Sequence, residues 1–115
     1  MREGTLTNCK EGNTMDEKQT ICAAIQTFGE RNQTVVAIEE LSELQKELCK
    51  LLRGSCDNDE HIAEEIADVE IVLCELVEML GIDDLVNMYR DFKIRRLQSR
   101  IAAEREKRGA GDVLP

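Results

Sequence analysis

Residues 57–81 read DNDEHIAEEIADVEIVLCELVEMLG, and this stretch decides the fold class. Its apolar residues recur with the 3.6-residue period of a helix and form one stripe. The stripe consists of Ile62, Ile66, Val69, Val72, Leu73, Leu76 and Leu80. Asp57 and Glu60 have the spacing of a capping box, and Gly81 is a typical helix stop. The stretch therefore predicts an amphipathic helix that buries one face against a neighbour.

Two more helices are predicted before this stretch. The first covers about residues 14–29 and begins with the capping-box pair Thr14 and Glu17. The second begins at Asn32 or Thr34, carries a leucine-rich stripe and ends at a glycine. Both repeat the helical period, which favours packed helices over strands.

A fourth helix is predicted after it, from Asp83 to about Glu104. Aromatic residues make up only 3% of the chain, so the core must consist of aliphatic side chains, which suits helices. The predicted fold is all-α, a short-loop bundle of about four helices. We expect a flexible arm over residues 1–13, one domain over 14–107 and a flexible tail over 108–115.

Composition excludes several classes of function. The net charge of -9 argues against a protein that coats polymeric nucleic acid or an anionic membrane. The sequence contains no Rossmann or P-loop glycine motif, and its single histidine excludes an HExxH zinc site. Five cysteines without a CxxC pair, and no signal peptide or long apolar span, predict a cytoplasmic protein with free thiols.

Charge is distributed unevenly along the chain. Between Glu39 and Asp84 there are fifteen acidic residues and three basic ones, whereas Arg90 to Arg108 contains eight basic residues and three acidic ones. The first region could hold cations, and the second could hold anions.

One carboxylate of residues 57–81 lies where a helix of this kind should be apolar. At about 100° per residue Glu65 falls inside the apolar stripe and Asp68 at its edge. Burying an unpaired carboxylate costs several kcal/mol, so such a residue needs a cation or a proton. Glu70, Glu75 and Glu78 fall farther round the helix and are predicted to be solvated.

The preceding helix has a similar set beside its leucine stripe, namely Glu39, Glu40 and Glu43. An exposed acidic face relieved by Lys46 and Lys50 explains this set equally well. Antiparallel packing of the two helices would bring both sets of carboxylates together. Hard oxygen ligands without a pair of Cys or His residues suit Mg²⁺ or Mn²⁺ better than zinc.

The pattern E-E-x-x-E from Glu39 to Glu43, followed by E-x-x-D from Glu65 to Asp68, resembles the signature of the MazG-like all-α nucleoside triphosphate pyrophosphohydrolases. The resemblance extends over about residues 28–96. It implies Mg²⁺-dependent hydrolysis of a nucleoside triphosphate between its α and β phosphates, which yields a monophosphate and pyrophosphate. The implied metal ligands are Glu40, Glu43, Glu65 and Asp68.

The resemblance also implies roles for other residues. Glu39 would hold a second ion or orient the attacking water, and Glu39, Glu43 and Glu65 are the predicted catalytic residues. Phosphate or sugar contacts are assigned to Asn87, Lys93 and Arg96. Arg90 or Arg95 could replace one of these, and a solvated basic face explains any one of them equally well. His61 is predicted to be a surface histidine at the start of its helix.

The sequence leaves two alternative functions open and also predicts an oligomer. A related enzyme, phosphoribosyl-ATP pyrophosphohydrolase, shares the fold type and metal chemistry that the resemblance implies. An acidic helical module that docks a basic partner is the non-enzymatic alternative, but it gives no reason for an acid inside the stripe at Glu65. The small expected core and the wide apolar stripes predict a homodimer or homotetramer, as does the resemblance.

Overall fold

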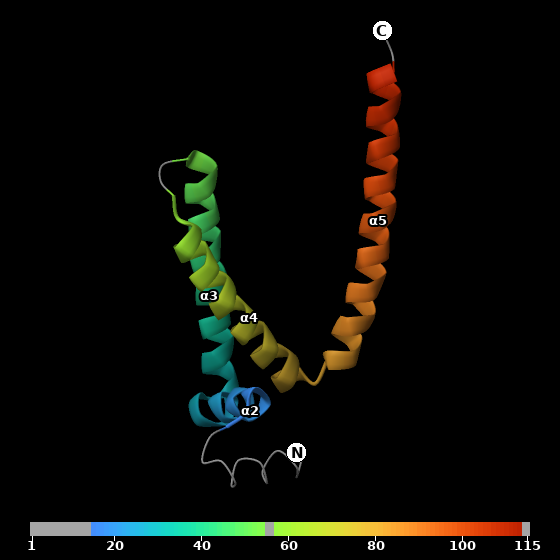
Figure 1. Cartoon of the computed structure of the whole chain (residues 1–115). Coiled ribbons are helices and arrows are strands. Elements are labelled where there is room, and N and C mark those ends of the chain that lie inside the picture. Colours follow the sequence, from blue (N-terminus) through green and yellow to red (C-terminus); the bar gives the residue numbers. More distant parts are fainter. Residues whose placement is uncertain (1–14, 55–56, 114–115) are drawn as a thin grey trace. The chain divides into compact units, whose positions relative to one another are not determined.

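The computed structural model describes residues 15–54 and 57–113, the last four of them by backbone alone. The described residues form helices and no strand, which confirms the all-α prediction (Figure 1). In chain order these helices are α2 (Glu17–Phe28), α3 (Glu30–Arg53), α4 (Asp59–Leu80) and α5 (Asp83–Val113). The predicted arm at residues 1–13 lies outside the described residues.

Helix α2 begins with a capping box, two residues later than the predicted one. The Asp16 side chain accepts a hydrogen bond from the Gln19 N–H at 2.7 Å, and Gln19 Oε1 accepts one from the Asp16 N–H at 2.9 Å. The capping box thereby satisfies the N–H groups of Asp16 and Gln19. The predicted cap, Thr14, lies outside the described residues.

Helix α3 begins earlier than predicted, at Glu30, directly after Gly29. The two predicted caps lie inside the helix, so this prediction was wrong. Asn32 donates a hydrogen bond to the Phe28 carbonyl and Thr34 donates one to the Glu30 carbonyl, both at 2.8 Å. Such short polar side chains can bond to the preceding turn as well as cap a helix, and spacing alone does not distinguish the two.

Helix α4 also begins differently from the prediction. Asn58 is the residue before its first turn, and the capping box predicted from Asp57 and Glu60 does not form. The Asn58 side chain makes no bond to its own helix and donates instead to Glu47 of α3. A contact between helices has replaced a local one.

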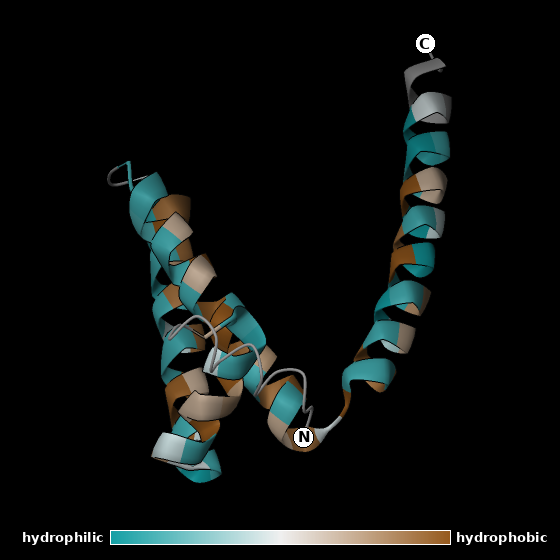
Figure 2. Ribbon diagram, turned by 60° about the horizontal axis from the view of Figure 1, so that its bottom comes forward, coloured by the Kyte–Doolittle hydropathy of each residue, from teal (hydrophilic) through white to brown (hydrophobic). Residues whose placement is uncertain are grey.

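Helices α3 and α4 pack antiparallel, and α2 lies across them (Figure 1). Gly54 and Gly81 end α3 and α4 in the left-handed conformation, with φ of 65° and 63°, which glycine adopts without strain. Apolar residues recur along the packed helices (Figure 2). The buried apolar residues of the described chain are Ile21, Ala37, Val69 and Val72.

The chain divides into two compact units, and α5 belongs to the second, Ile82–Pro115. It continues to Val113, beyond the predicted end near Glu104 and through most of the predicted tail. Strong helix formers up to Arg108, and an ion pair between Arg108 and Glu104 at 3.3 Å and one turn apart, favour its extension past Glu104. None of the described helices combines the length and apolar character needed to cross a membrane.

Candidate metal site

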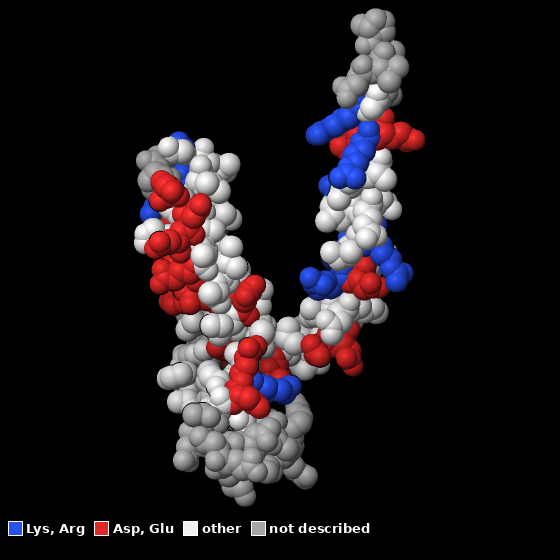
Figure 3. Space-filling model, in the orientation of Figure 1, with Lys and Arg blue, Asp and Glu red and all other residues white. Residues whose placement is uncertain are grey.

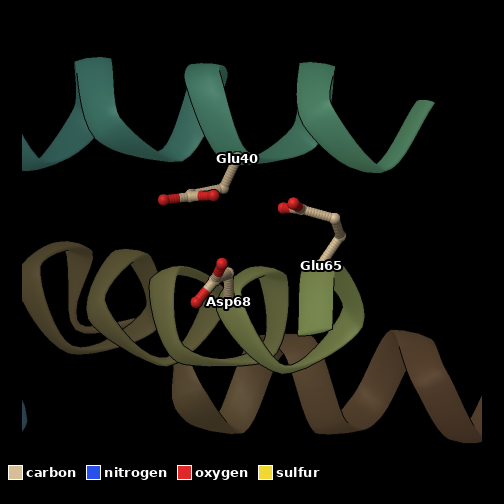
Figure 4. Close-up of side chains that lie close together, drawn as sticks. All are labelled: Glu40, Glu65 and Asp68. Atoms are coloured by element: carbon tan, nitrogen blue, oxygen red, sulfur yellow. The ribbon is translucent and has the colours of Figure 1, made fainter. Parts of the chain in front are cut away.

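Three carboxylates from the two predicted motifs meet between α3 and α4. Glu40 projects from α3, and Glu65 and Asp68 project from adjacent turns of α4, with their carboxylates in the space between the helices (Figure 4). One oxygen atom from each residue can be chosen so that all three lie within 4.8 Å of one another. The structure therefore brings together the central acids of both motifs.

Buried apolar residues lie near the acids on both helices. Val69 and Val72 of α4 and Ala37 of α3 are buried, and each lies within about two turns of a carboxylate of the group. Glu65 lies in the same stripe as the two valines, so it points toward α3 whenever they are buried. Its Oε1 atom is buried and has no hydrogen-bond partner among the described residues. Such an unpaired acceptor is uncommon in folded proteins, and a bound cation is one kind of group that would satisfy it.

The pKa shifts of Glu40 and Glu65 agree with the closeness of the three carboxylates. Desolvation raises the pKa of Glu40, and the nearby charges of Asp68 and Glu65 raise it further. Desolvation is also the main cause of the raised pKa of Glu65, followed by the charge of Asp68. A bound cation would remove the repulsion among these carboxylates and would satisfy the orphaned oxygen. The group could therefore bind a metal ion, and its all-oxygen donor set suits a hard cation.

The other two acids of the first motif lie beside this group. Glu43 is exposed and forms an ion pair with Lys46 at 3.5 Å, yet its charge contributes to the raised pKa of both Glu40 and Glu65. Glu39 is also exposed, and its charge acts on Glu40. Neither belongs to the group of three, so their assignment as ligands or catalytic residues stays a prediction.

The predicted phosphate-binding residues lie on α5. Asn87, Lys93 and Arg96 are all exposed. Arg95, one of the alternatives, forms an ion pair with Asp91 at 3.0 Å, whereas Arg90 lines an apolar groove on α5 together with Lys93. Their roles also stay a prediction, because α5 belongs to the second compact unit.

Sequence reasoning was wrong about two acids of α4. Glu75, predicted to be solvated, is buried and accepts a hydrogen bond from Gln33 Nε2 at 2.6 Å. Glu78 is partly buried and forms an ion pair with Lys18 of α2 at 3.2 Å. Only Glu70 is exposed as predicted. Helical angles do not show which sides of α4 its neighbours cover, and both α2 and α3 lie against it.

A second buried acid, Glu47, was not singled out from the sequence. Its carboxylate accepts hydrogen bonds from Asn58 Nδ2 at 2.8 Å and from Lys50 Nζ at 3.3 Å. The bond from Asn58 is the main cause of a lowered Glu47 pKa, with smaller contributions from Lys50 and from His61, which is exposed as predicted. Its spacing of seven residues from Glu40 was the available signal.

Acidic side chains gather along α3 and α4, whereas most basic side chains in view lie on α5 (Figure 3). This separation follows the charge distribution in the sequence.

Comparisons with family models, curated proteins and solved structures give no match to the chain. The function of the chain is therefore inferred from its residues and their geometry.

Proposed function

We propose that the protein is a Mg²⁺-dependent nucleoside triphosphate pyrophosphohydrolase of the cytoplasm. It would hydrolyse an NTP or dNTP to the monophosphate and pyrophosphate, in house-cleaning or in control of the nucleotide pool. One observation carries the proposal: Glu40, Glu65 and Asp68 converge between two helices, and the buried Glu65 Oε1 has no partner there. The motif spacing that resembles the MazG-like enzymes supports the choice of reaction.

Glu40, Glu65 and Asp68, with Glu43 beside them, would hold Mg²⁺ or Mn²⁺. The ion would offset the roughly four negative charges of a triphosphate and lower the pKa of a bound water. Glu39 would hold a second ion or orient the water that attacks. The bond that breaks is the phosphoanhydride between the α and β phosphates, and pyrophosphate leaves. This chemistry needs no side-chain nucleophile.

Asn87, Lys93 and Arg96 are proposed to contact the phosphates or the sugar. The basic surface of α5 supports this assignment, since a triphosphate needs cationic donors beyond those at the metal. We expect Lys93→Ala to raise the KM for the triphosphate about tenfold, with a smaller effect on kcat, because it removes one charged contact. An unchanged KM would remove Lys93 from the proposal.

The decisive experiment measures pyrophosphate release with and without Mg²⁺. The panel contains the common NTPs and dNTPs and phosphoribosyl-ATP, so that it also tests the related enzyme. Glu40→Gln is the test variant and Glu70→Gln is its control, because Glu70 is an exposed acid on α4 outside the group. Mg²⁺-dependent release that Glu40→Gln loses and Glu70→Gln keeps is the expected result. No release from any substrate would favour the acidic docking module.

We also propose that the protein is a homodimer or homotetramer. Few apolar residues are buried in the described chain, and large ones are exposed along one side of α3, where Ile38 is 63% and Leu52 is 86% exposed. Leu41 and Leu48 continue that side at heptad-like spacing. Sedimentation should detect an oligomer at micromolar concentration that Leu48→Glu dissociates. A monomeric parent protein would refute this assignment.

A further inference from the structure

The α3–α4 interface contains three polar layers with apolar residues between them. The α3 members are spaced seven residues apart and are Gln33, Glu40 and Glu47. Their partners, in the matching order, are Glu75 of α4, the pair Glu65 and Asp68 of α4, and Asn58, the residue directly before α4. The candidate metal site is thus the middle layer of an ordered series.

The two end layers (Gln33 with Glu75, Glu47 with Asn58) differ from the middle one because their carboxylates have donors. Gln33 Nε2 donates to Glu75 Oε1 at 2.6 Å, and both residues are buried. Asn58 Nδ2 donates to Glu47 Oε1 at 2.8 Å and to the Glu47 carbonyl at 3.0 Å, and both of these residues are also buried. Each end layer is therefore a buried amide–carboxylate pair that joins the two helices.

Such pairs are weak evidence for stability, because apolar residues of the same size often do as well or better. Their best-attested effect is on alignment, as when one buried polar residue fixes the register of a coiled coil. A slip of one helical turn moves one helix by about 5.4 Å along the other. That slip would bury Glu47 and Glu75 without their donors, which is strongly unfavourable.

The carboxylates of the middle layer converge only when α3 and α4 are aligned in this register. Glu40 contributes the single α3 oxygen of the group of three, and its partners occupy adjacent turns of α4. After a slip of one turn, Glu40 would face the neighbourhood of His61 or of Val72 instead. Oxygen atoms from both helices would then no longer converge.

We propose that the two end layers fix the register of α3 against α4 and thereby align Glu40 with Glu65 and Asp68. Gln33, Glu47, Asn58 and Glu75 are then positioning residues of the metal site. The alignment itself is independent of the proposed enzyme activity, and only its effect on metal binding rests on the proposed function.

The test compares three proteins in a background whose five cysteines are replaced by serine or alanine. In the apolar variant, Gln33→Leu and Glu75→Met remove one end layer, and Glu47→Leu and Asn58→Leu remove the other. The exchange variant, Gln33→Glu with Glu75→Gln, reverses the first pair and keeps an amide opposite a carboxylate. Gln26→Leu with Glu70→Leu is the control, because these exposed residues undergo similar changes outside the α3–α4 interface.

Register is read without metal, as the distance between spin labels at the exposed positions Ser42 and Ala63 of one subunit. The labelled protein is diluted with unlabelled protein, so that distances between subunits do not contribute. We expect one narrow distance in the parent, the control and the exchange variant. The apolar variant should show a second population several Å away, although its Tm is equal or higher. If four substitutions prevent folding, Gln33→Leu with Glu75→Met alone gives the same comparison. One unchanged distance in the folded apolar variant would overturn the proposal.

Mn²⁺ affinity, measured by electron paramagnetic resonance, tests the second half of the proposal. We expect it to fall at least tenfold in the apolar variant and to stay within about twofold in the control and the exchange variant. An apolar variant with parental affinity would show that the end layers do not position the site. A parent protein that binds no Mn²⁺ would refute the proposed metal site, while the label distances would still decide the question of register.

Discussion

Glu47 and Glu65 are glutamates of the same helix–helix interface, two helical turns or so apart, and their environments have opposite effects. Asn58 and Lys50 donate to the Glu47 carboxylate, and its pKa is lowered. Glu65 has a buried oxygen without a partner, and desolvation beside other acids raises its pKa. The same residue type is thus stabilised as an anion in one layer and destabilised as an anion in the next.

This difference distinguishes a buried acid whose hydrogen bonds the protein itself supplies from one that is available to a ligand. Burial alone does not separate them, since Glu47 is the more buried of the two. The separating property is whether the protein itself supplies the donors. Four experiments test this contrast, in order of decreasing expected effect.

Glu65→Gln should have the largest effect, and this effect should be on turnover and not on thermal stability. It removes a ligand charge without changing the side-chain volume, so Mg²⁺-dependent turnover should fall at least about 100-fold. The Tm of the metal-free protein should not fall, because the charge removed is one that its surroundings disfavour. Turnover assays and circular dichroism check both statements. Parental turnover in this variant would show that Glu65 is not a ligand.

Asn58→Leu should have the opposite profile, with its main effect on stability. It leaves the Glu47 carboxylate buried without its principal donor, and the Tm should fall by roughly 5 to 10 °C. The double variant Asn58→Leu with Glu47→Leu should recover that loss, because no buried charge then remains in this layer. Thermal denaturation of the two variants measures the difference. A Tm unaffected by Asn58→Leu would mean that Glu47 finds its donors elsewhere.

Mg²⁺ should stabilise the parent protein and not the Glu65→Gln variant. A ligand that binds only the folded state adds about 2.7 kcal/mol when its concentration is 100 times its Kd. We therefore expect the Tm of the parent at pH 7.5 to rise by several degrees between chelator and millimolar Mg²⁺. Equal shifts in both proteins would place the binding away from the middle layer.

The smallest effects concern pH in the absence of metal, and the two layers should give opposite signs. The raised pKa values of Glu40 and Glu65 predict stability that is present below their ordinary value of 4.5 and lost as the pH rises through the raised values. The lowered pKa of Glu47 predicts stability that is present above 4.5 and lost as the pH falls through the lowered value. Melting of the metal-free protein from pH 3 to 8, with Glu65→Gln and Glu47→Gln, separates the two. Glu65→Gln should remove the loss at higher pH, and a parental profile in that variant would contradict the assignment.

Sequence periodicity predicted the helices better than their beginnings. The helix predicted within residues 57–81 is present as α4 (Asp59–Leu80), and the glycine stops at Gly54 and Gly81 agree with the structure. The starts at Asn32 or Thr34 and at Asp57 were wrong, because each depends on which of several bonds a short polar side chain makes. Tertiary contacts decide that choice, as the bond from Asn58 to Glu47 shows.

The sequence likewise predicted some features of the candidate site and not others. Periodicity alone put Glu65 into the apolar stripe, and motif spacing selected Glu40 and Asp68. The burial of Glu75 could not be predicted from the sequence. A helical angle does not show how much of the surface of α4 its neighbouring helices cover. Only its bond to Gln33, a residue 42 positions away in the chain, shows that it is buried with a partner.

The sequence by itself determined the helices and the side of α4 on which Glu65 lies, because both follow from a local 3.6-residue period that apolar burial enforces. Only the tertiary structure decided which oxygens meet. Convergence of Glu40 with Glu65 and Asp68 depends on the register of two antiparallel helices. Contacts between α3 and the residues of α4 and its N-terminal cap set that register, and the packing of the helices leaves Glu47 with donors and the buried Glu65 Oε1 without one.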